Sequence, residues 1–135
     1  MKKTFGIILI TLFMAVLATA FKRGDAPKPW PVPETSSAKK NTVPSDATSI
    51  ADGKDLYITH CASCHGKKGK GDGPKAAQLE TDCGDLSSAL SQKQSDGSIF
   101  YKIQTGRDDM PSFKKKIPDA DDIWSIVNYV RTLKQ

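Results

Sequence analysis

The stretch HCASCHGKKGKGDGP, residues 60–74, contains two cysteines three positions apart and a histidine directly after the second. Cysteine pairs at this spacing serve three different chemistries: thiol–disulfide exchange, zinc binding and covalent haem attachment. What Cys61, Cys64 and His65 hold together therefore largely determines what the chain does. The composition and patterning of the remaining residues decide among these chemistries.

The composition limits the chain to a small domain with a modest core. Its length of 135 residues suits one domain, and domains with small cores often need disulfides, a metal or a large cofactor. Three cysteines, of which the third is Cys83, are too few and of the wrong parity for a disulfide scaffold. The formal net charge of +5 is too small to indicate nucleic-acid binding.

Residues 1–20 are predicted to be a secretory signal peptide or an N-terminal membrane anchor. A short basic segment precedes an uncharged apolar run, and Ala18-Thr19-Ala20 is typical of a cleavage site. The run over residues 5–21 reaches only the lower edge of membrane-spanning length. Cleavage and a membrane tether through residues 5–21 both remain open, and both predict an exported protein. We expect it in the periplasm, soluble or anchored to the outer face of the cytoplasmic membrane.

Residues 21–48 are predicted to be a flexible, proline-rich linker. Prolines alternate with lysine, serine and threonine, and few large apolar residues are present to bury. Such a segment either holds a domain away from a membrane surface or is a dispensable tail. Trp30 is the one residue in it that we expect to dock onto the domain.

Residues 49–135 show helical patterns and no convincing alternation of period two, which predicts an all-α domain. Ser49 and Asp52 resemble a capping box, and Asp85 can cap a short helix. Two clearer helices are expected from Ser95 or Asp96 to Gly106, and from Asp119 onward. Their apolar stripes are formed by Ile99, Phe100 and Ile103, and by Ile123, Ile126, Val127 and Val130.

An exported, all-helical domain favours haem attachment at the cysteine pair. Thioredoxin-like thiol exchange needs βαβ surroundings, and a four-ligand zinc site would have to be completed by Cys83 and His60. A histidine directly after the second cysteine is what haem attachment requires, because it becomes an axial ligand of the iron. We therefore predict one haem c, covalent through Cys61 and Cys64 and ligated by His65. Thiol redox chemistry and zinc binding stay open as alternatives.

Met110 is the predicted second axial ligand. It is the only methionine after the N-terminal segment, and His60 is too near His65 in sequence to reach the opposite haem face. Pro111 stiffens the loop behind it. A single methionine is often core filler, but this one follows the polar stretch Gly106-Arg107-Asp108-Asp109, where filler has little to contact. The ligand role is therefore favoured.

Residues 50–133 resemble a small mono-haem class I c-type cytochrome. The resemblance rests on Cys61-Ala62-Ser63-Cys64-His65-Gly66, Gly73-Pro74, Gly106 with Met110-Pro111, and Asp122-Ile123-Trp124 through Tyr129-Val130. It implies a cytochrome c-like helical fold wrapped around one covalent haem, whose first and last helices cross at Gly53, Tyr57 and Tyr129. It also implies that the Pro74 carbonyl accepts the ring N–H of His65, which makes Pro74 part of the cofactor-binding set.

One segment departs from the family pattern. The family often has prolines where this chain reads Thr81-Asp82-Cys83-Gly84-Asp85. Cys83 is expected to be a small, partly buried residue, or else a thiol that pairs between molecules.

The expected function is one-electron transfer without catalysis, because iron bound by both His65 and Met110 has no open position. The family-level partners are redox proteins of a respiratory chain, namely a quinol-oxidising complex and a terminal oxidase or reductase. Two lysine clusters are expected either to surround the exposed haem edge and attract an acidic partner, or to be solvated faces. They comprise Lys67, Lys68 and Lys70, and Lys114, Lys115 and Lys116.

Two other functions remain open. The chain is alternatively the electron-input subunit of a periplasmic oxidoreductase, or a small haem enzyme whose methionine ligand is labile.

Overall fold

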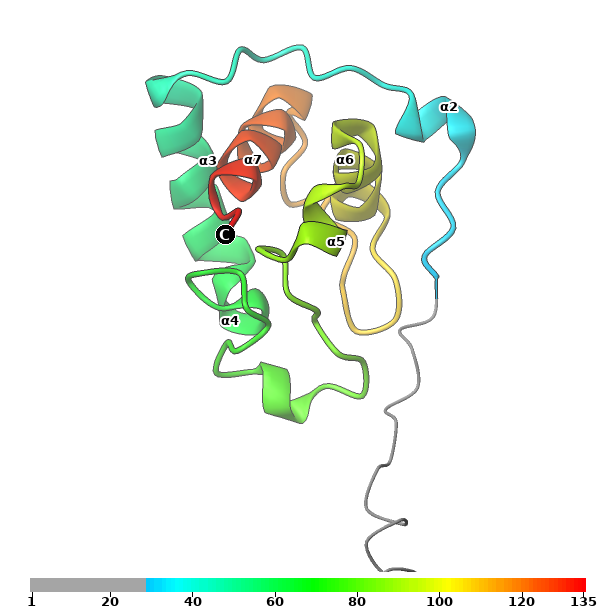
Figure 1. Ribbon diagram of the computed structural model, residues 1–135, viewed down its shortest axis with the longest axis vertical. Helices are drawn as coiled ribbons and strands as arrows, with labels where there is room; N and C mark the ends of the chain where they lie inside the picture. Colours follow the sequence, from blue (N-terminus) through cyan, green and yellow to red (C-terminus); the bar gives the residue numbers. More distant parts are fainter. Residues whose placement is uncertain (1–28) are drawn as a thin grey trace, which may run out of the picture.

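The computed structural model describes residues 29–135 (Figure 1), so the predictions for residues 1–28 lie outside the described part of the chain. The elements are α2 (Glu34–Ser37), α3 (Ala47–His60), α4 (Ala62–His65), the 3-10 helix η1 (Ala76–Gln78), α5 (Ala89–Gln92), α6 (Asp96–Thr105) and α7 (Ala120–Thr132). Between residues 29 and 135 the only β-type pairing is one isolated bridge, so the predicted all-α class is confirmed. No helix in this range has the length and apolar character needed to cross a membrane.

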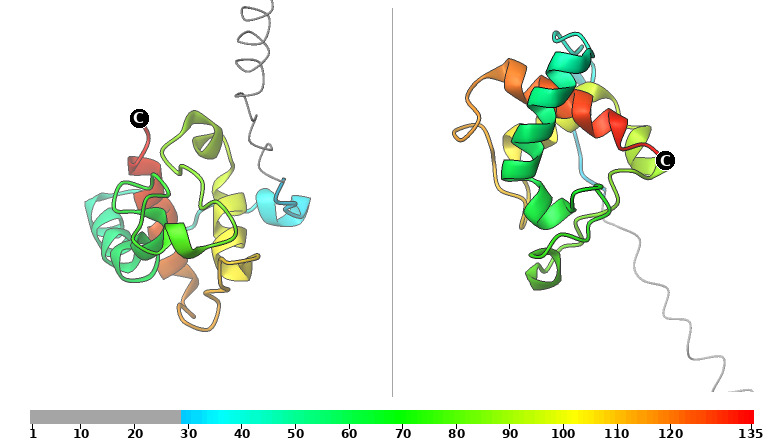
Figure 2. Two further views of the ribbon diagram at one scale, coloured as in Figure 1. Left: turned by 90° about the horizontal axis from the view of Figure 1, so that it is seen from below. Right: turned by 90° about the vertical axis from the view of Figure 1, so that its left-hand side faces the viewer.

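Helices α3 and α7 cross in close contact, as Figure 2 shows in its right-hand view. Gly53 makes the crossing possible, because a Cβ atom there would lie 1.9 Å from the backbone oxygen of Ser125. One turn further along, the rings of Tyr57 and Tyr129 pack with their centroids 5.1 Å apart. The crossing fixes the direction of α3 and therefore the position of Cys61, which follows its last residue.

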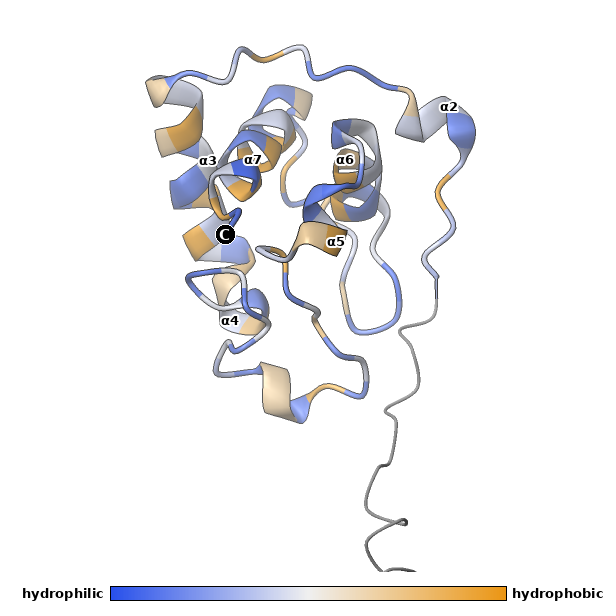
Figure 3. Ribbon diagram, in the orientation of Figure 1, coloured by the Kyte–Doolittle hydropathy of each residue, from blue (hydrophilic) through white to orange (hydrophobic). Residues whose placement is uncertain are grey.

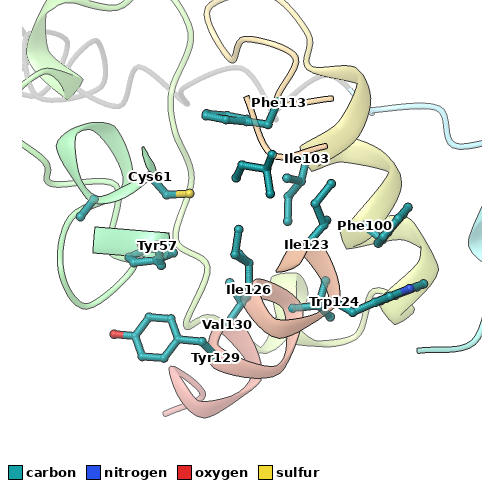
Figure 4. Close-up of a cluster of buried hydrophobic side chains, with 13 residues drawn as sticks. Tyr57, Cys61, Phe100, Ile103, Phe113, Ile123, Trp124, Ile126, Tyr129 and Val130 are labelled. Atoms are coloured by element: carbon teal, nitrogen blue, oxygen red, sulfur yellow. The ribbon is translucent and has the colours of Figure 1, made fainter. Parts of the chain in front are cut away.

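The core lies between α7 and the helices on either side of it. Nearly the whole of α7 is buried, and its amphipathic alternation is visible in the hydropathy colouring of Figure 3. From α6, Phe100 stacks on Trp124 at a centroid distance of 4.1 Å, and Ile103 is buried beside them. Figure 4 shows this cluster reaching across to Cys61.

The ends of α6 and α7 are those the sequence predicts. The Ser95 side chain accepts the Ser98 backbone N–H, and α6 ends at Gly106 with a φ of 65°. The Asp119 side chain accepts the Asp121 N–H at the start of α7. Both are hydrogen bonds to backbone donors that the first turn of a helix leaves without partners.

Two predicted helix starts are wrong. Helix α3 begins three residues earlier than the sequence predicts, because Asp46 is its N-cap and Ser49 returns the second hydrogen bond of the capping box. Helix α5 is capped by Ser88, since the Asp85 carboxylate instead accepts the backbone and hydroxyl protons of Ser87. In both cases a neighbouring polar residue takes the capping position.

Residues 29–46, which we call the arm, lie against the domain and fall in the segment predicted to be a flexible linker (Figure 1). The Asn41 side chain donates to Asn128 of α7 over 2.8 Å. At α2, the backbone oxygen of Ser36 approaches Gly97 so closely that a Cβ atom there would lie 2.3 Å away. Trp30, the predicted docking residue, is half-buried between two cationic side chains. Contacts with α6 and α7 thus hold a segment that has little apolar surface of its own.

Candidate functional site: the cysteine–histidine motif and the Met110 turn

The motif sits at the end of α3, in one short run of helical turns. The Cys61 N–H still donates to Tyr57, and the N–H groups of Cys64 and His65 both donate to the Cys61 carbonyl. This geometry brings Cys61, Cys64 and His65 onto adjacent turns, as their spacing predicts. In Figure 4 the Cys61 sulfur points toward the interior, facing Phe113 and Ile103 from the opposite wall of the core.

A glycine-rich loop folds back onto the motif. The N–H groups of Gly71 and Gly73 donate to the carbonyls of His65 and Cys64, over 2.9 and 3.1 Å. The Tyr57 hydroxyl donates to the Gly66 carbonyl over 2.8 Å. A Cβ atom at Gly73 would lie 2.5 Å from the Ser63 carbonyl oxygen, so only glycine allows this approach. This role was not predicted from the sequence, although the four glycines at 66, 69, 71 and 73 are its visible signal.

The His65 ring is buried, and burial lowers its pKa below the usual value for histidine, while a hydrogen bond to the backbone of Cys83 opposes that shift. The ring is therefore neutral at neutral pH, which is the form that binds a metal. Its Nδ1 atom is buried without a hydrogen-bond partner among residues 29–135. A buried polar atom without a partner is rare and costly, so it marks a position built for something other than packing.

The two motif thiols differ in their surroundings. Burial, together with the neighbouring Cys64, raises the pKa of Cys61 to about 12, so its sulfur is protonated at neutral pH. Cys64 is less buried, and both are free thiols. A reactive redox cysteine instead has a lowered pKa, as in thiol–disulfide exchange proteins. The environment of Cys61 suits a sulfur that ends in an uncharged thioether.

The hydrogen bond expected between Pro74 and His65 is not formed, since Nδ1 of His65 has no partner among the described residues. Pro74 itself is exposed and lies beside the motif, between Gly73 and Lys75. The Lys75 backbone N–H donates to the Ser63 carbonyl over 2.8 Å and so holds this backbone against the motif. The ring's hydrogen bond is made with the backbone of the Cys83 loop, while its Nδ1 atom stays without a partner.

Met110 ends a tight turn that follows α6. Its N–H and carbonyl pair with the carbonyl and N–H of Arg107 over 2.9 and 2.8 Å, and Asp108 within the turn has a φ of 50°. The Met110 side chain is half-buried and packs against the core cluster. The turn is linked to the Cys83 loop, because the Thr81 N–H donates to the Asp109 carboxylate over 2.8 Å. The Met110 turn therefore touches the same loop that contacts His65.

The two lysine clusters lie at the surface, and the first lies beside the motif. Lys67 and Lys68 are exposed and line a hollow of about 470 Å³ on its outer side, with Ile58, Ala62 and Ser63. Ile58 is 41% exposed and adds apolar surface to the lining of this hollow. Lys70 is engaged instead with Asp85 at 3.7 Å, and Lys114, Lys115 and Lys116 are exposed beyond Phe113.

The donor set fits haem c. Two free thiols stand on adjacent turns, a buried imidazole lies beside them, and a half-buried thioether comes from the turn linked to the same loop. A zinc site fits less well, since nowhere in residues 29–135 do three His, Cys, Asp or Glu side chains gather closely enough to hold a metal ion.

Comparison with known proteins assigns the family. Residues 48–130 match the family model described as cytochrome C oxidase, cbb3-type, subunit III, and the chain belongs to this family of cytochrome c domains. Over 90 residues it is 29% identical to the cytochrome bc1 complex cytochrome c subunit of Corynebacterium diphtheriae, covering 67% of this chain and 29% of that protein. Family membership implies a covalently bound haem c.

Two solved structures share the fold. A chain of the Kuenenia stuttgartiensis reducing HAO-like protein complex superposes with a TM-score of 0.63 at 27% identity, covering 80% of this chain and 53% of that one. The c-type cytochrome KustC0563 gives a TM-score of 0.55 at 31% identity, covering 62% of this chain and 99% of its own length. The chain thus spans about a third of the length of the curated relative and about half of the larger structure.

Proposed function

We propose that this cytochrome c domain carries single electrons through one haem c, attached at Cys61 and Cys64, with His65 and Met110 as axial ligands. The observation that carries the proposal is the buried, neutral His65 ring, held on the helical turn that also carries two free cysteines. A buried imidazole of this kind needs a ligand for its ring nitrogen, and iron of a covalent haem at the adjacent thiols supplies one.

Different residues would attach the haem and position its ligands. The haem supplies reversible one-electron chemistry when bound. Cys61 and Cys64 fix its position through thioethers, and the glycine-rich loop fixes the backbone of His65 from behind. The thioether of Met110 is a soft ligand that favours the reduced iron, so a positive reduction potential is expected. With both axial positions taken by the protein, no open position remains for substrate.

The partners we propose are other redox proteins of an electron-transfer chain. The names of the relatives include a bc1 complex and an HAO-like complex, which supports a place beside or within such an assembly. The hollow next to the motif combines apolar surface from Ile58 and Ala62 with two lysines, Lys67 and Lys68, against one carboxylate, Asp72. This combination suits an acidic partner with a small apolar centre. We further propose that the protein works outside the cytoplasmic membrane, either free or tethered through residues 5–21.

The docking part of the proposal is tested by charge reversal. Lys67→Glu with Lys68→Glu should slow electron transfer to a partner and weaken its dependence on ionic strength, because steering by opposite charge is screened by salt. Lys93→Glu is the matched control, since Lys93 is an exposed lysine at the end of α5, away from the motif. Equal slowing by Lys93→Glu and by the double variant would contradict a docking role for Lys67 and Lys68.

Covalent attachment is tested on the exported protein by haem staining after denaturing electrophoresis. We expect haem to stay with the wild-type chain and with Cys83→Ser, and to be lost from Cys61→Ala/Cys64→Ala. Cys83→Ser is the matched control because Cys83 is the remaining free cysteine of the chain. Loss of haem from all three, or from none, would contradict attachment at the motif.

The axial ligands are tested by absorption spectra in both redox states. Wild-type protein should give a low-spin ferrous spectrum and the weak far-red band of thioether-bound ferric iron. Met110→Ala should keep the covalent haem, lose that band and react with carbon monoxide. A wild-type spectrum that already shows a vacant or labile sixth position would instead favour a small haem enzyme.

A further inference from the structure

Trp30 of the arm lies between two cationic side chains that belong to α6 and to the Met110 turn. The Lys102 Nζ atom is 5.3 Å from the centre of the Trp30 ring, and the Arg107 Cζ atom is 4.7 Å from it. Both distances are within the range of cation–π attraction. Burial, with the nearby charge of Arg107, lowers the pKa of Lys102, which shows how closely these groups are packed.

Arg107 is held from both sides. Its Nη1 atom donates to the Pro29 carbonyl over 3.0 Å, so the arm binds the guanidinium with a ring face and a backbone acceptor. Its Nε atom also lies 3.1 Å from the Asp108 carboxylate, within the turn itself. The guanidinium therefore links the arm to the turn that carries Met110.

The backbone of Arg107 closes the turn that ends at Met110. Arg107 and Met110 exchange two backbone hydrogen bonds, so they are the two ends of one closed unit that includes Asp108 and Asp109. A rotation of Arg107 away from α6 would break these bonds or move Met110 with it. Contacts that hold Arg107 in place therefore also hold the backbone of Met110 in place.

We propose that the arm positions the methionine ligand, with Trp30 and Arg107 as positioning residues for Met110. The inference rests on the proposed role of Met110 as an axial ligand. Contacts with Trp30 and Pro29 stabilise the turn in the closed conformation, in which Met110 packs against the core. Removal of these contacts increases the population in which the turn is open and the thioether is away from the iron.

The test measures how fast cyanide replaces the sixth ligand in the full-length, haem-loaded ferric protein. At saturating cyanide the observed rate reports opening of the turn. Trp30→Ala should raise this rate about 5- to 30-fold, the factor expected when Arg107 loses its cation–π contact with Trp30 and, as the arm loosens, its hydrogen bond to Pro29. Trp30→Phe, which keeps an aromatic face, should restore most of the wild-type rate. Hydrogen exchange at the Met110 amide should accelerate in Trp30→Ala in parallel.

Asn41→Ala is the matched control, because Asn41 attaches the arm to α7 and does not contact the turn. Asn41→Ala should change the cyanide rate less than threefold, even if it lowers the thermal stability as much as Trp30→Ala does. If Trp30→Ala fails to fold, Trp30→Leu provides the same test, since it keeps an apolar side chain at this place and removes the aromatic face from Arg107.

Three outcomes separate the inferences. A wild-type rate in Trp30→Ala, or an equal increase in Asn41→Ala, would overturn the positioning role. If Met110→Ala leaves the absorption spectrum unchanged, the ligand assignment itself fails. If Met110→Ala changes the spectrum while Trp30→Ala behaves as wild type, the ligand assignment stands and only the positioning role is overturned.

Discussion

Replacing Gly53 with alanine tests whether the crossing of α3 and α7 determines the fold. Two effects of opposite sign compete at this position. Alanine is the better helix former by about 1 kcal/mol, which alone would stabilise α3. Its Cβ atom, however, would lie 1.9 Å from the Ser125 oxygen, 2.4 Å from the Ser125 carbonyl carbon and 2.9 Å from the Ile126 nitrogen.

The steric effect should dominate. All three neighbouring atoms belong to backbone, so no change of side-chain rotamer relieves the overlap, and the helices must separate by about 1 Å. Overpacking of a core costs about 1–3 kcal/mol, and a rigid backbone neighbour places this case near the upper limit. After the gain in helix propensity, a net loss of about 2 kcal/mol remains. For a domain of this size, that corresponds to a decrease in Tm of roughly 10 °C.

Thermal and urea unfolding, followed by far-UV circular dichroism on the haem-loaded protein, give both quantities. Ala51→Gly is the matched control, because Ala51 is an exposed residue of the same helix. It should lose about 1 kcal/mol through helix propensity alone. A Gly53→Ala protein as stable as wild type, or more stable, would mean that propensity dominates and that the helices tolerate separation.

Three further substitutions test individual hydrogen bonds, each by urea unfolding. Tyr57→Phe should lower the free energy of unfolding by about 1 kcal/mol, because it removes the buried bond to the Gly66 carbonyl; a loss within experimental error would show that water replaces the bond. Asn128→Ala should cost about 2 kcal/mol, since the buried amide bonds Asn41 and the arm backbone, and proteolysis of the arm should become faster. Ser95→Ala should cost about 1 kcal/mol as the loss of an N-cap, and an unchanged stability would argue against that capping bond.

Helix ends were predicted correctly from the sequence where only one nearby residue can serve as the cap. Helix α7 combines an apolar stripe with a single capping aspartate, Asp119, and both features act within a few residues of each other. At α3, two polar residues compete for the cap. Ser49 does belong to the capping box, but as its third helical residue, and Asp46 lies at the start. Composition alone does not decide which of two polar residues becomes the N-cap, because the choice depends on the path of the chain that precedes the helix.

The arm was the least predictable part of the structure from composition. Its prolines and polar residues indicate a linker, and the contacts that hold it come from residues far along the chain, such as Lys102, Arg107 and Asn128. Only Trp30 gave a local signal, because a large aromatic ring in a polar segment usually finds a partner. Long-range pairing of polar groups leaves no periodicity in the sequence.

At the site, the sequence predicted where the motif residues lie relative to one another, but not the hydrogen bonds of the His65 ring. The spacing of Cys61, Cys64 and His65 requires that they meet on one helical run, and they do. The hydrogen bond of the His65 ring depends instead on the course of a separate loop. That loop carries Cys83 in the segment where the chain departs from the family pattern, and its backbone contacts the His65 ring. The departure was visible in the sequence, but its consequence for His65 was not.

The two sides of the site differ in what holds them. His65 is fixed by hydrogen bonds between main-chain groups of the glycine-rich loop and the motif, within the residues that the family model matches. Met110 depends on a four-residue turn, and that turn is supported by the arm, which precedes the matched residues. Ligands must be held by supporting contacts if their geometry is to stay constant during electron transfer. In the proposed site, the histidine side therefore follows from the family motif, whereas the proposed support of the methionine side comes from contacts of Trp30 and Arg107 that the motif does not contain.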